Sequence, residues 1–533
     1  MNEVLRGWTV VVRARLRANR MSVLVMAVLM AVIGAAQLQA FVSVFPEKAT
    51  RTAILGPFVN NTALRVLYGY PYDIADPAGW VAWRSMTFAG IVMAMWAAII
   101  TTGALRGEED CARGELVLSG LQPRRRWFAA VLAATALQAV VIGAVTVTAL
   151  AADGVPQHLV TFANCVELGL QLVLPALVFG AIAALTSQLA ATVRAARLLA
   201  AGILVVAFII RAPADIGSGI TWLRWVTPLG WFELLRPPAA PSLLVLTVVA
   251  AGIIVPVLIS LPLLAVRDIG RGVLPVRDSR PARRALLGAS WQAALRDEAA
   301  HLGFWLVGTA AYALLMGAMV QTALDFVRRT PTYAQFFGDK LAVDGFIAAF
   351  YSLIQLIAAL LAVTLLVAAR GEEASGRLEI VLAMPRSRIG WLCGRALLAV
   401  GLATVVCVIA AVAIWAGASA TGVRVGIGSL LAAAGNSLPL IVVTVGVTAA
   451  VLGLAPRAVA FVYALVVTVF LWDALGTALK APNWSLQLSP FHALPRVPMQ
   501  HFALPPALWI TAIGLGSFGI ALFAFRRRDL AMG

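Results

Sequence analysis

One pattern of charged residues occurs twice in this chain, 264 positions apart. The segment RGEEDCARGELVLSGLQPRRRW at 106–127 aligns without a gap with RGEEASGRLEIVLAMPRSRIGW at 370–391, and ten of the 22 positions are identical. In each copy the second glutamate lies four residues before an arginine, which is the favourable order for an ion pair along a helix. The pattern predicts a short helix with a charged, exposed end.

The shared charged residues that form this candidate site are Arg106, Glu108, Glu109, Arg113 and Glu115 in the first copy, and Arg370, Glu372, Glu373, Arg377 and Glu379 in the second. The helical spacing pairs Glu109 with Arg113 and Glu373 with Arg377. A solvated turn that shields the ends of membrane helices is one interpretation of these segments. We favour docking to a cytoplasmic partner, because two copies of one charged pattern suit a two-fold partner with two equivalent grooves.

Other reactive patterns are missing from the sequence. A phosphate-binding P-loop needs a lysine followed by Ser or Thr, but the three lysines precede Ala49, Leu341 and Ala481. The four histidines form no H-E-x-x-H pattern, and the four cysteines include no short-spaced pair. We therefore expect no catalytic, cofactor or metal site in this chain.

The composition is that of a membrane protein. Of the 533 residues, 61% are hydrophobic and 12% are charged, whereas soluble domains have roughly 45–50% and about 25%. A soluble enzyme with a membrane anchor is excluded, because the segments between apolar runs are too short for a sizeable soluble domain. The formal net charge is +17. Since the arginines lie between apolar runs, they indicate contact with anionic lipid headgroups and not with nucleic acid.

Twelve apolar runs are long enough to cross a bilayer. They lie at about 21–41, 84–105, 128–151, 162–190, 196–212, 241–266, 302–322, 345–369, 394–417, 428–454, 458–478 and 506–525. With both chain ends placed inside, the cytoplasmic segments hold 28 arginines and the outer segments hold the other 13 basic residues. The sequence therefore predicts an all-α, multi-pass membrane protein with cytoplasmic N- and C-termini.

The repeat extends beyond the RGEE segments. Pro175 matches Pro439, Thr227-Pro228 matches Ser489-Pro490, and Arg267-Asp268 matches Arg528-Asp529. We predict two parallel six-span halves, 1–266 and 291–533, joined by a cytoplasmic linker over 267–290. The halves are parallel because six is even and both RGEE segments follow the second span of their half.

These features resemble the permeases of ABC-2-type exporters, specifically the actinobacterial antibiotic and multidrug exporters of the tetronasin-transport type. The resemblance implies coupling helices at 106–121 and 370–385 and interfacial connecting helices at 2–20 and 286–301. It also implies a bacterial plasma membrane and a separate cytoplasmic ATP-binding cassette protein, in two copies, that would bind ATP and Mg²⁺. The first copy has Asp110 and Gly114 where the second has Ala374 and Leu378, so the two contacts need not be equally strong.

Few polar groups lie within the expected spans. Candidates for the substrate path are Glu167, Gln171, Gln355 and Asn436. So few fixed charges favour a lipophilic or amphiphilic small-molecule substrate. The aromatic segments 213–238 and 479–505 are either re-entrant pieces that cap the exit or part of an interfacial aromatic belt.

Two other classes of protein were weighed. An ion-coupled carrier of the major facilitator type also has twelve spans in two parallel halves, but its usual loop after the second span differs from the acidic-led RGEED here. A lipid-processing membrane enzyme would need an outer acidic site, which the sequence does not show.

Overall fold

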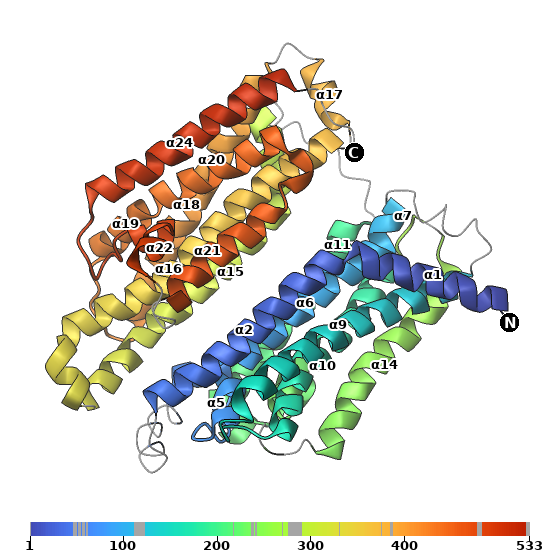
Figure 1. Ribbon diagram of the computed structural model, residues 1–533, viewed down its shortest axis with the longest axis horizontal. Coiled ribbons are helices and arrows are strands. Elements are labelled where there is room, and N and C mark those ends of the chain that lie inside the picture. The colour runs from blue at the N-terminus through green and yellow to red at the C-terminus, as the bar shows by residue number, and fades with distance from the viewer. Residues whose placement is uncertain are drawn as a thin grey trace. The chain divides into compact units, whose positions relative to one another are not determined.

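The computed structural model divides the chain into two compact units, a first unit, Met1–Arg280, and a second unit, Pro281–Gly533. The described residues are 2–45, 51, 55, 59, 62–110, 123–216, 218–235, 239, 242–268, 270–274, 290–329, 331–374, 376–383, 387–476 and 482–528. All regular elements in these ranges are helical (Figure 1).

The first unit opens with α1 (Asn2–Ala18), which is followed after Asn19 by the apolar helix α2 (Arg20–Val44). The second span is built in consecutive pieces that run from Pro77 to Asp110. These pieces are α5 (Pro77–Val81), η1 (Ala82–Met86), α6 (Thr87–Thr102), η2 (Gly103–Gly107) and α7 (Glu108–Asp110). Both η1 and η2 are π-helical turns, which occur frequently at functional sites.

Eight further helices complete the described part of the first unit. They are α4 (Thr62–Tyr68), α9 (Arg124–Gly154), α10 (Phe162–Leu189), α11 (Val193–Ile216), η3 (Ser218–Ile220), α12 (Leu223–Val226), α13 (Pro228–Glu233) and α14 (Leu243–Val266). Helix α10 is the most buried of the long helices, and it packs against α6, α9 and α14. Helix α1 lies against α9. Its Trp8, Val12 and Leu16 are half-buried while Arg13 and Arg17 are exposed, as expected for an interfacial helix.

The second unit has longer helices. They are α15 (Ser290–Arg329), α16 (Pro331–Ala374), α17 (Arg377–Leu382), α18 (Arg388–Ala420), α19 (Ile427–Asn436), α20 (Leu438–Leu454), η4 (Pro456–Ala458), α21 (Phe461–Gly476), α22 (Asn483–Gln487), α23 (Pro490–Ala493) and α24 (Leu504–Arg527). The described part of the predicted connecting segment, residues 290–301, and the seventh span share one continuous helix, α15, where the first unit has two helices. Pro175 lies inside the unbroken α10, whereas its counterpart Pro439 begins α20 after a break at Ser437.

Eleven helices among the described residues are long and apolar enough to cross a membrane. The chain is therefore an all-α, multi-pass membrane protein, as the sequence predicts. The remaining apolar run, predicted at 458–478, corresponds to α21, whose 16 residues rise only about 24 Å at 1.5 Å each. The end of this run, from residue 477, lies outside the described residues.

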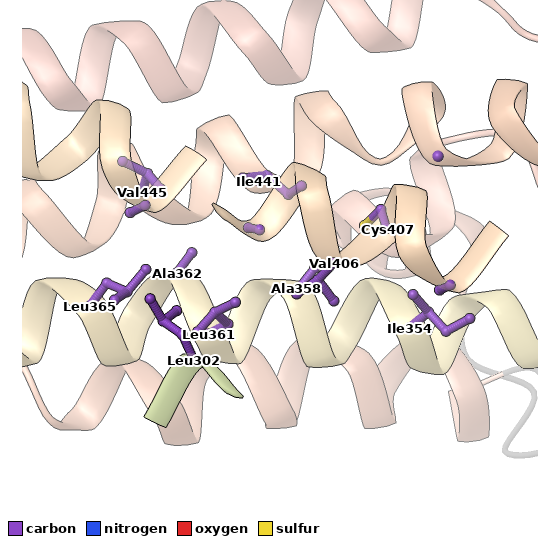
Figure 2. Close-up of a cluster of buried hydrophobic side chains, with 14 of the residues drawn as sticks. Leu302, Ile354, Ala358, Leu361, Ala362, Leu365, Val406, Cys407, Ile441 and Val445 are labelled. Carbon is purple, nitrogen blue, oxygen red and sulfur yellow. The ribbon is translucent and has the colours of Figure 1, made fainter. Parts of the chain in front are cut away.

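The core of the second unit is formed by small and branched side chains from α15, α16, α18 and α20. Figure 2 shows Ile354, Ala358, Leu361 and Leu365 of α16 lined up beside Val406 of α18 and Ile441 of α20. Small residues let membrane helices approach closely, which is the main source of packing energy between helices in lipid.

Gly514 of α24 illustrates this close packing and gives a first testable prediction. A Cβ atom at Gly514 would lie 2.7 Å from the backbone nitrogen of Val443 on α20, whereas a Cβ at Gly516 meets nothing within 4 Å. Gly514→Val should therefore force α20 and α24 apart and cost about 1–3 kcal/mol, while Gly516→Val should be tolerated. Thermal unfolding of the purified variants measures the difference, and equal melting temperatures would refute this packing.

Candidate coupling site

Glu109, the second glutamate of the first RGEE segment, is buried between two arginines. Its carboxylate accepts a hydrogen bond of 2.8 Å from Arg106 Nη1 and another of 2.8 Å from Arg267 Nη1, and Arg267 Nη2 also donates to it. The exposed fractions of the side chains are 0% for Arg106, 3% for Glu109 and 5% for Arg267. The ion pair between Glu109 and Arg267 therefore links the end of the second span to the residue that follows the sixth span.

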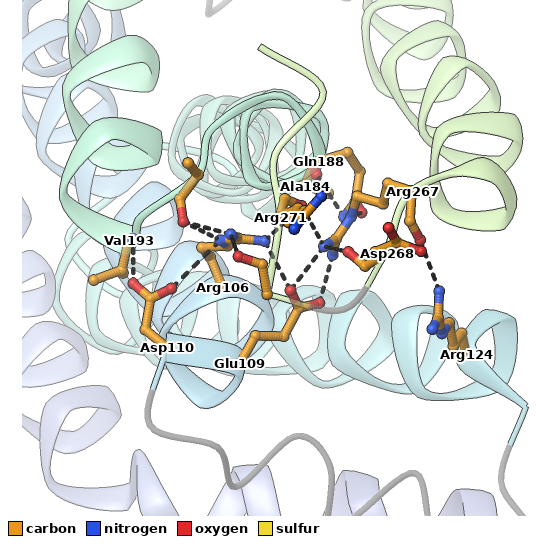
Figure 3. A network of polar contacts seen from close by, with 12 residues as sticks. Arg106, Glu109, Asp110, Arg124, Ala184, Gln188, Val193, Arg267, Asp268 and Arg271 are labelled. Carbon is orange, nitrogen blue, oxygen red and sulfur yellow. Dashed lines mark hydrogen bonds and ion pairs between the residues drawn. The ribbon is translucent and has the colours of Figure 1, made fainter. Parts of the chain in front are cut away.

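Further hydrogen bonds hold the segment after the sixth span, Arg267–Leu274, against the same end of the unit (Figure 3). Arg106 Nη2 donates to the Gly270 carbonyl at 2.7 Å, and Arg106 Nη1 donates to the Arg271 carbonyl at 3.1 Å. Arg124, the first residue of α9, donates to the Arg267 carbonyl at 2.9 Å. The second, third and sixth spans thus meet at one polar cluster, which we call the first clamp: Arg106, Glu109, Arg124 and Arg267.

The beginning of the expected linker is folded onto the first unit. The backbone nitrogens of Val273 and Leu274 donate to the carbonyls of Gln188 and Leu189 at 3.2 and 2.9 Å. Gly272 passes so close to Ala190 that a Cβ atom would lie 2.4 Å from the Ala190 carbonyl carbon. Residues 275–289 lie outside the described residues.

The first glutamate of the segment, Glu108, connects the clamp to α1. Its carboxylate is 3.0 Å from Arg15 Nη1 on α1, and both side chains are about one-fifth exposed. Asp110 accepts a hydrogen bond of 2.7 Å from the backbone nitrogen of Val193, the first residue of α11. Helices α1 and α11 are therefore also attached to the RGEE segment.

The second unit repeats this arrangement with the matching residues. Glu373 accepts a hydrogen bond of 2.7 Å from Arg528 Nη2 and lies 3.6 Å from Arg370 Nη1. Arg388, the first residue of α18, donates to the Arg528 carbonyl at 3.0 Å. We call Arg370, Glu373, Arg388 and Arg528 the second clamp. In addition, Glu372 is paired with Arg395 of α18.

The helical spacing predicts Glu109 and Glu373 at an exposed helix end, and this prediction is wrong. Both carboxylates are buried, because the arginine after the sixth span of the same unit covers them. Glu109 is paired with Arg106 and Arg267, while its expected partner Arg113, like Glu115, lies outside the described residues. Glu373 forms ion pairs with Arg370 and Arg528.

The exposed part of the second RGEE segment is the short helix α17. Leu378 is fully buried in the core, whereas Arg377, Glu379 and Ile380 are exposed, Ile380 to 70%. Gly376 precedes the helix with a φ of +72°, a left-handed conformation that sets α17 off from α16. An exposed aliphatic residue beside charged residues of both signs is suited to contact with another protein.

The sequence analysis identified the glutamates but not their partners Arg267 and Arg528. The signal for them was present, because Arg267-Asp268 and Arg528-Asp529 match in the repeat. A glutamate and an arginine that pair in one half are expected to pair at the matching positions of the other half. Two repeated positions of opposite charge could therefore have indicated the clamps.

The candidates for the substrate path fall into separate groups. In the first unit, Gln171 of α10 is buried and lines a cavity with Glu233, while Glu167 lies one turn before Gln171 on the same helix. In the second unit, Gln355 Nε2 of α16 donates to Ser437 Oγ at 3.3 Å. Asn436 donates to the Pro495 carbonyl at 2.8 Å. Among the described residues no three His, Cys, Asp or Glu side chains form a group that could hold a metal ion.

Comparison with known proteins gives two matches. The sequence pattern of the family described as "Multidrug efflux system permease Rv1217c, C-terminal domain" matches residues 287–526. The whole chain is 30% identical over 539 residues to the multidrug efflux system permease protein Rv1217c of Mycobacterium tuberculosis (strain ATCC 25618 / H37Rv). That alignment covers 97% of this chain and 94% of the relative. The chain therefore belongs to the family of the multidrug efflux permease Rv1217c.

Proposed function

We propose that this chain is the membrane-spanning subunit of an ATP-driven exporter of lipophilic or amphiphilic compounds. ATP would be hydrolysed, with Mg²⁺, by a separate cytoplasmic ATP-binding cassette protein, bound in two copies. The relative is named a multidrug efflux permease, which supports this substrate class. The clamp end of each unit would face the cytoplasm of a bacterial cell, with both chain termini on that side.

The observation that carries this proposal is the attachment of α17 to the second clamp. Glu373 lies at the end of α16, four residues before Arg377, and it accepts a hydrogen bond from Arg528, the residue after α24. The Arg528 carbonyl in turn accepts a hydrogen bond from Arg388 at the start of α18. A partner that moves α17 would therefore act on the second, third and sixth spans of the unit together. Such a rigid connection is what a coupling site needs, because a packed, fully bonded cluster transmits a displacement instead of absorbing it.

The first clamp suits the same role for residues 111–122, which lie outside the described residues. The interfacial helix α1 is joined to it through the Arg15–Glu108 pair at 3.0 Å. A pair of this exposure contributes little energy, but it fixes where α1 lies relative to the second span. We propose that α1 is the connecting helix of this unit and rests at the membrane surface.

Substitution of Ile380 tests the docking role. Ile380→Glu buries an unpaired carboxylate in the proposed contact, which costs more than about 1.4 kcal/mol, so partner binding should weaken at least tenfold. Val155→Glu is the matched control, because it adds the same charge to an exposed aliphatic residue at the opposite end of α9. Co-purification of an ATPase with the chain, and export from cells, measure the effect.

Two outcomes would contradict the proposal. If Ile380→Glu keeps both partner binding and export, α17 is not the docking helix. If export continues with a catalytically dead partner but stops when the proton gradient is dissipated, the chain is an ion-coupled carrier.

A further inference from the structure

A second buried charge cluster lies at the end of the first unit opposite the first clamp. It consists of Arg211 and Asp215 at the end of α11, Arg224 of α12 and Glu233 of α13, and we call it the charge ring. Arg224 Nε lies 2.9 Å from Asp215 Oδ1 and 3.8 Å from Glu233 Oε2. Arg211 Nε lies 3.5 Å from Asp215 Oδ2, and Arg211 Nη1 donates to Glu233 Oε1. All four side chains are more than nine-tenths buried.

Three oxygen atoms in and beside the ring accept no hydrogen bond from the described residues. They are Glu233 Oε2, Asp215 Oδ2 and Gln171 Oε1. A buried acceptor without a donor is costly, so native structures supply a proton or a water molecule. The carboxyl groups of Glu233 and Asp215 lie within hydrogen-bonding reach of each other. One proton placed between them would therefore satisfy both carboxyl oxygens.

Two small cavities meet at these residues. One is lined by Gly90, Pro175 and Phe232, and the other by Tyr68, Tyr70 and Tyr72. Both are also lined by Thr87, Gln171 and Glu233. Each cavity has a volume of about 20 Å³, which is room for one water molecule and far less than a drug-sized ligand needs.

The tyrosine-lined cavity lies between the ring and side chains that reach the surface of the unit. Tyr70 and Tyr72 are half-buried, whereas Gln171 and Glu233 are buried. Tyr72 also accepts a hydrogen bond of 3.1 Å from Arg224 Nη1, so its hydroxyl lies at the ring.

We infer that Glu233 is a proton-binding site, reached by one water molecule through the tyrosine-lined cavity, and that Glu233 and Asp215 share the bound proton. A hydronium ion entering this cavity transfers its proton to Glu233 Oε2 and is left as water. The new O–H donates to Asp215 Oδ2, and the remaining water donates to Gln171 Oε1. Each unsatisfied oxygen then has a donor, and no oxidant or further reactant is needed.

The surroundings of Glu233 favour the protonated form near neutral pH. Burial raises the pKa of Glu233 to about 8, the nearby Arg211 lowers it, and Asp215 raises it. The charged groups that face Glu233 are Arg211 and Asp215 from α11 and Arg224 from α12, while α6 and α10 contribute the uncharged Thr87 and Gln171.

The proton would control the packing of α13 against α11. With the proton bound, Glu233 is neutral and only accepts a hydrogen bond from Arg211. Without the proton, Glu233 is a carboxylate and forms a full ion pair with Arg211 between α13 and α11. If the clamp end faces the cytoplasm, as proposed above, the charge ring lies at the outer end and would respond to the pH outside the cell. Only this statement rests on the proposed function.

Thermal unfolding of the purified full chain against pH tests the proton site without any partner. The pKa of Glu233 is raised on folding, so between the ordinary value of 4.5 and about 8 the folded state holds a proton that the unfolded carboxyl has released. Stability from this group is therefore complete at low pH and is lost as the pH rises towards 8. The wild-type melting temperature should fall by at least roughly 2 °C more than that of Glu233→Gln between about pH 6 and about pH 9.

Asp153→Asn is the matched control, because Asp153 is a half-buried carboxylate in the last turn of α9, where it accepts hydrogen bonds of 2.9 Å from Gln39 Nε2. It should keep the wild-type dependence on pH. Parallel curves for the wild type and Glu233→Gln would overturn the inference. Infrared spectroscopy of the wild type gives a second measurement, independent of any variant: a protonated carboxyl band should be present near pH 7 and disappear as the pH rises above about 8. Absence of that band would also overturn the inference, and neither result bears on whether an ATPase binds the chain.

Discussion

Glu109→Ala is expected to destabilise the first unit by about 3–5 kcal/mol, because it removes the carboxylate that neutralises two buried arginines. Arg106 and Arg267 would keep their carbonyl acceptors but would lose the negative charge that lies within 2.8 Å of both. The chain should melt at a lower temperature, and less folded protein should be recovered from membranes. Fluorescence-detected size-exclusion chromatography after a heating series measures both quantities.

Glu108→Ala is the control for this prediction. Glu108 is the neighbouring glutamate, but its side chain is 20% exposed and its ion pair with Arg15 lies at the surface. Removing such a pair costs about 0–1 kcal/mol. If Glu109→Ala, like Glu108→Ala, has the same melting temperature as the wild type, the first clamp contributes no stability and cannot serve as a rigid connection.

Arg528→Ala is expected to weaken the second unit by about 1.5–3 kcal/mol, the usual contribution of a hydrogen bond to a charged group. Glu373 would lose this donor and keep Arg370, at 3.6 Å. Arg526→Ala, two residues earlier on the exposed face of α24, should have no measurable effect. Thermal unfolding of the purified chain measures the change.

A double-mutant cycle separates this pair from general damage. If Glu373 and Arg528 interact as the structure shows, the double variant Glu373→Ala/Arg528→Ala should cost less than the sum of the single variants, by about 0.5–3 kcal/mol. Strict additivity would show that the two side chains do not stabilise each other.

Helix content and membrane class could be predicted from the sequence, because a run of about 20 apolar residues has few alternatives to a membrane helix. The repeated RGEE pattern also pointed to residues that form the two clamps. The pattern did not predict the burial of Glu109. The helical spacing indicates Arg113 as its partner, whereas the structure pairs it with Arg267, 158 positions away. Local spacing gives no information on such a contact, which depends on where the sixth span ends.

The charge ring is another set of contacts between distant residues that could not be predicted from the sequence. Asp215 and Glu233 attract no notice in the sequence, because each is a single acidic residue in an aromatic segment. Only the fold brings α11, α12 and α13 together so that four charges compensate one another. The halves also differ where the sequence repeats: Pro175 is accommodated inside α10, while Pro439 follows a helix break.

The contacts seen in each clamp stay within its own unit, and this bears on how such a chain could have arisen. Among the described residues, the hydrogen bonds of the first clamp join residues before 272, and those of the second clamp join residues after 369. A half-length ancestor carrying one RGEE segment and one terminal arginine would therefore have secured its own last span before any duplication. Fusion of two copies then required only a connection after that arginine, and it left the two halves free to diverge, as the unequal helices around Pro175 and Pro439 have done.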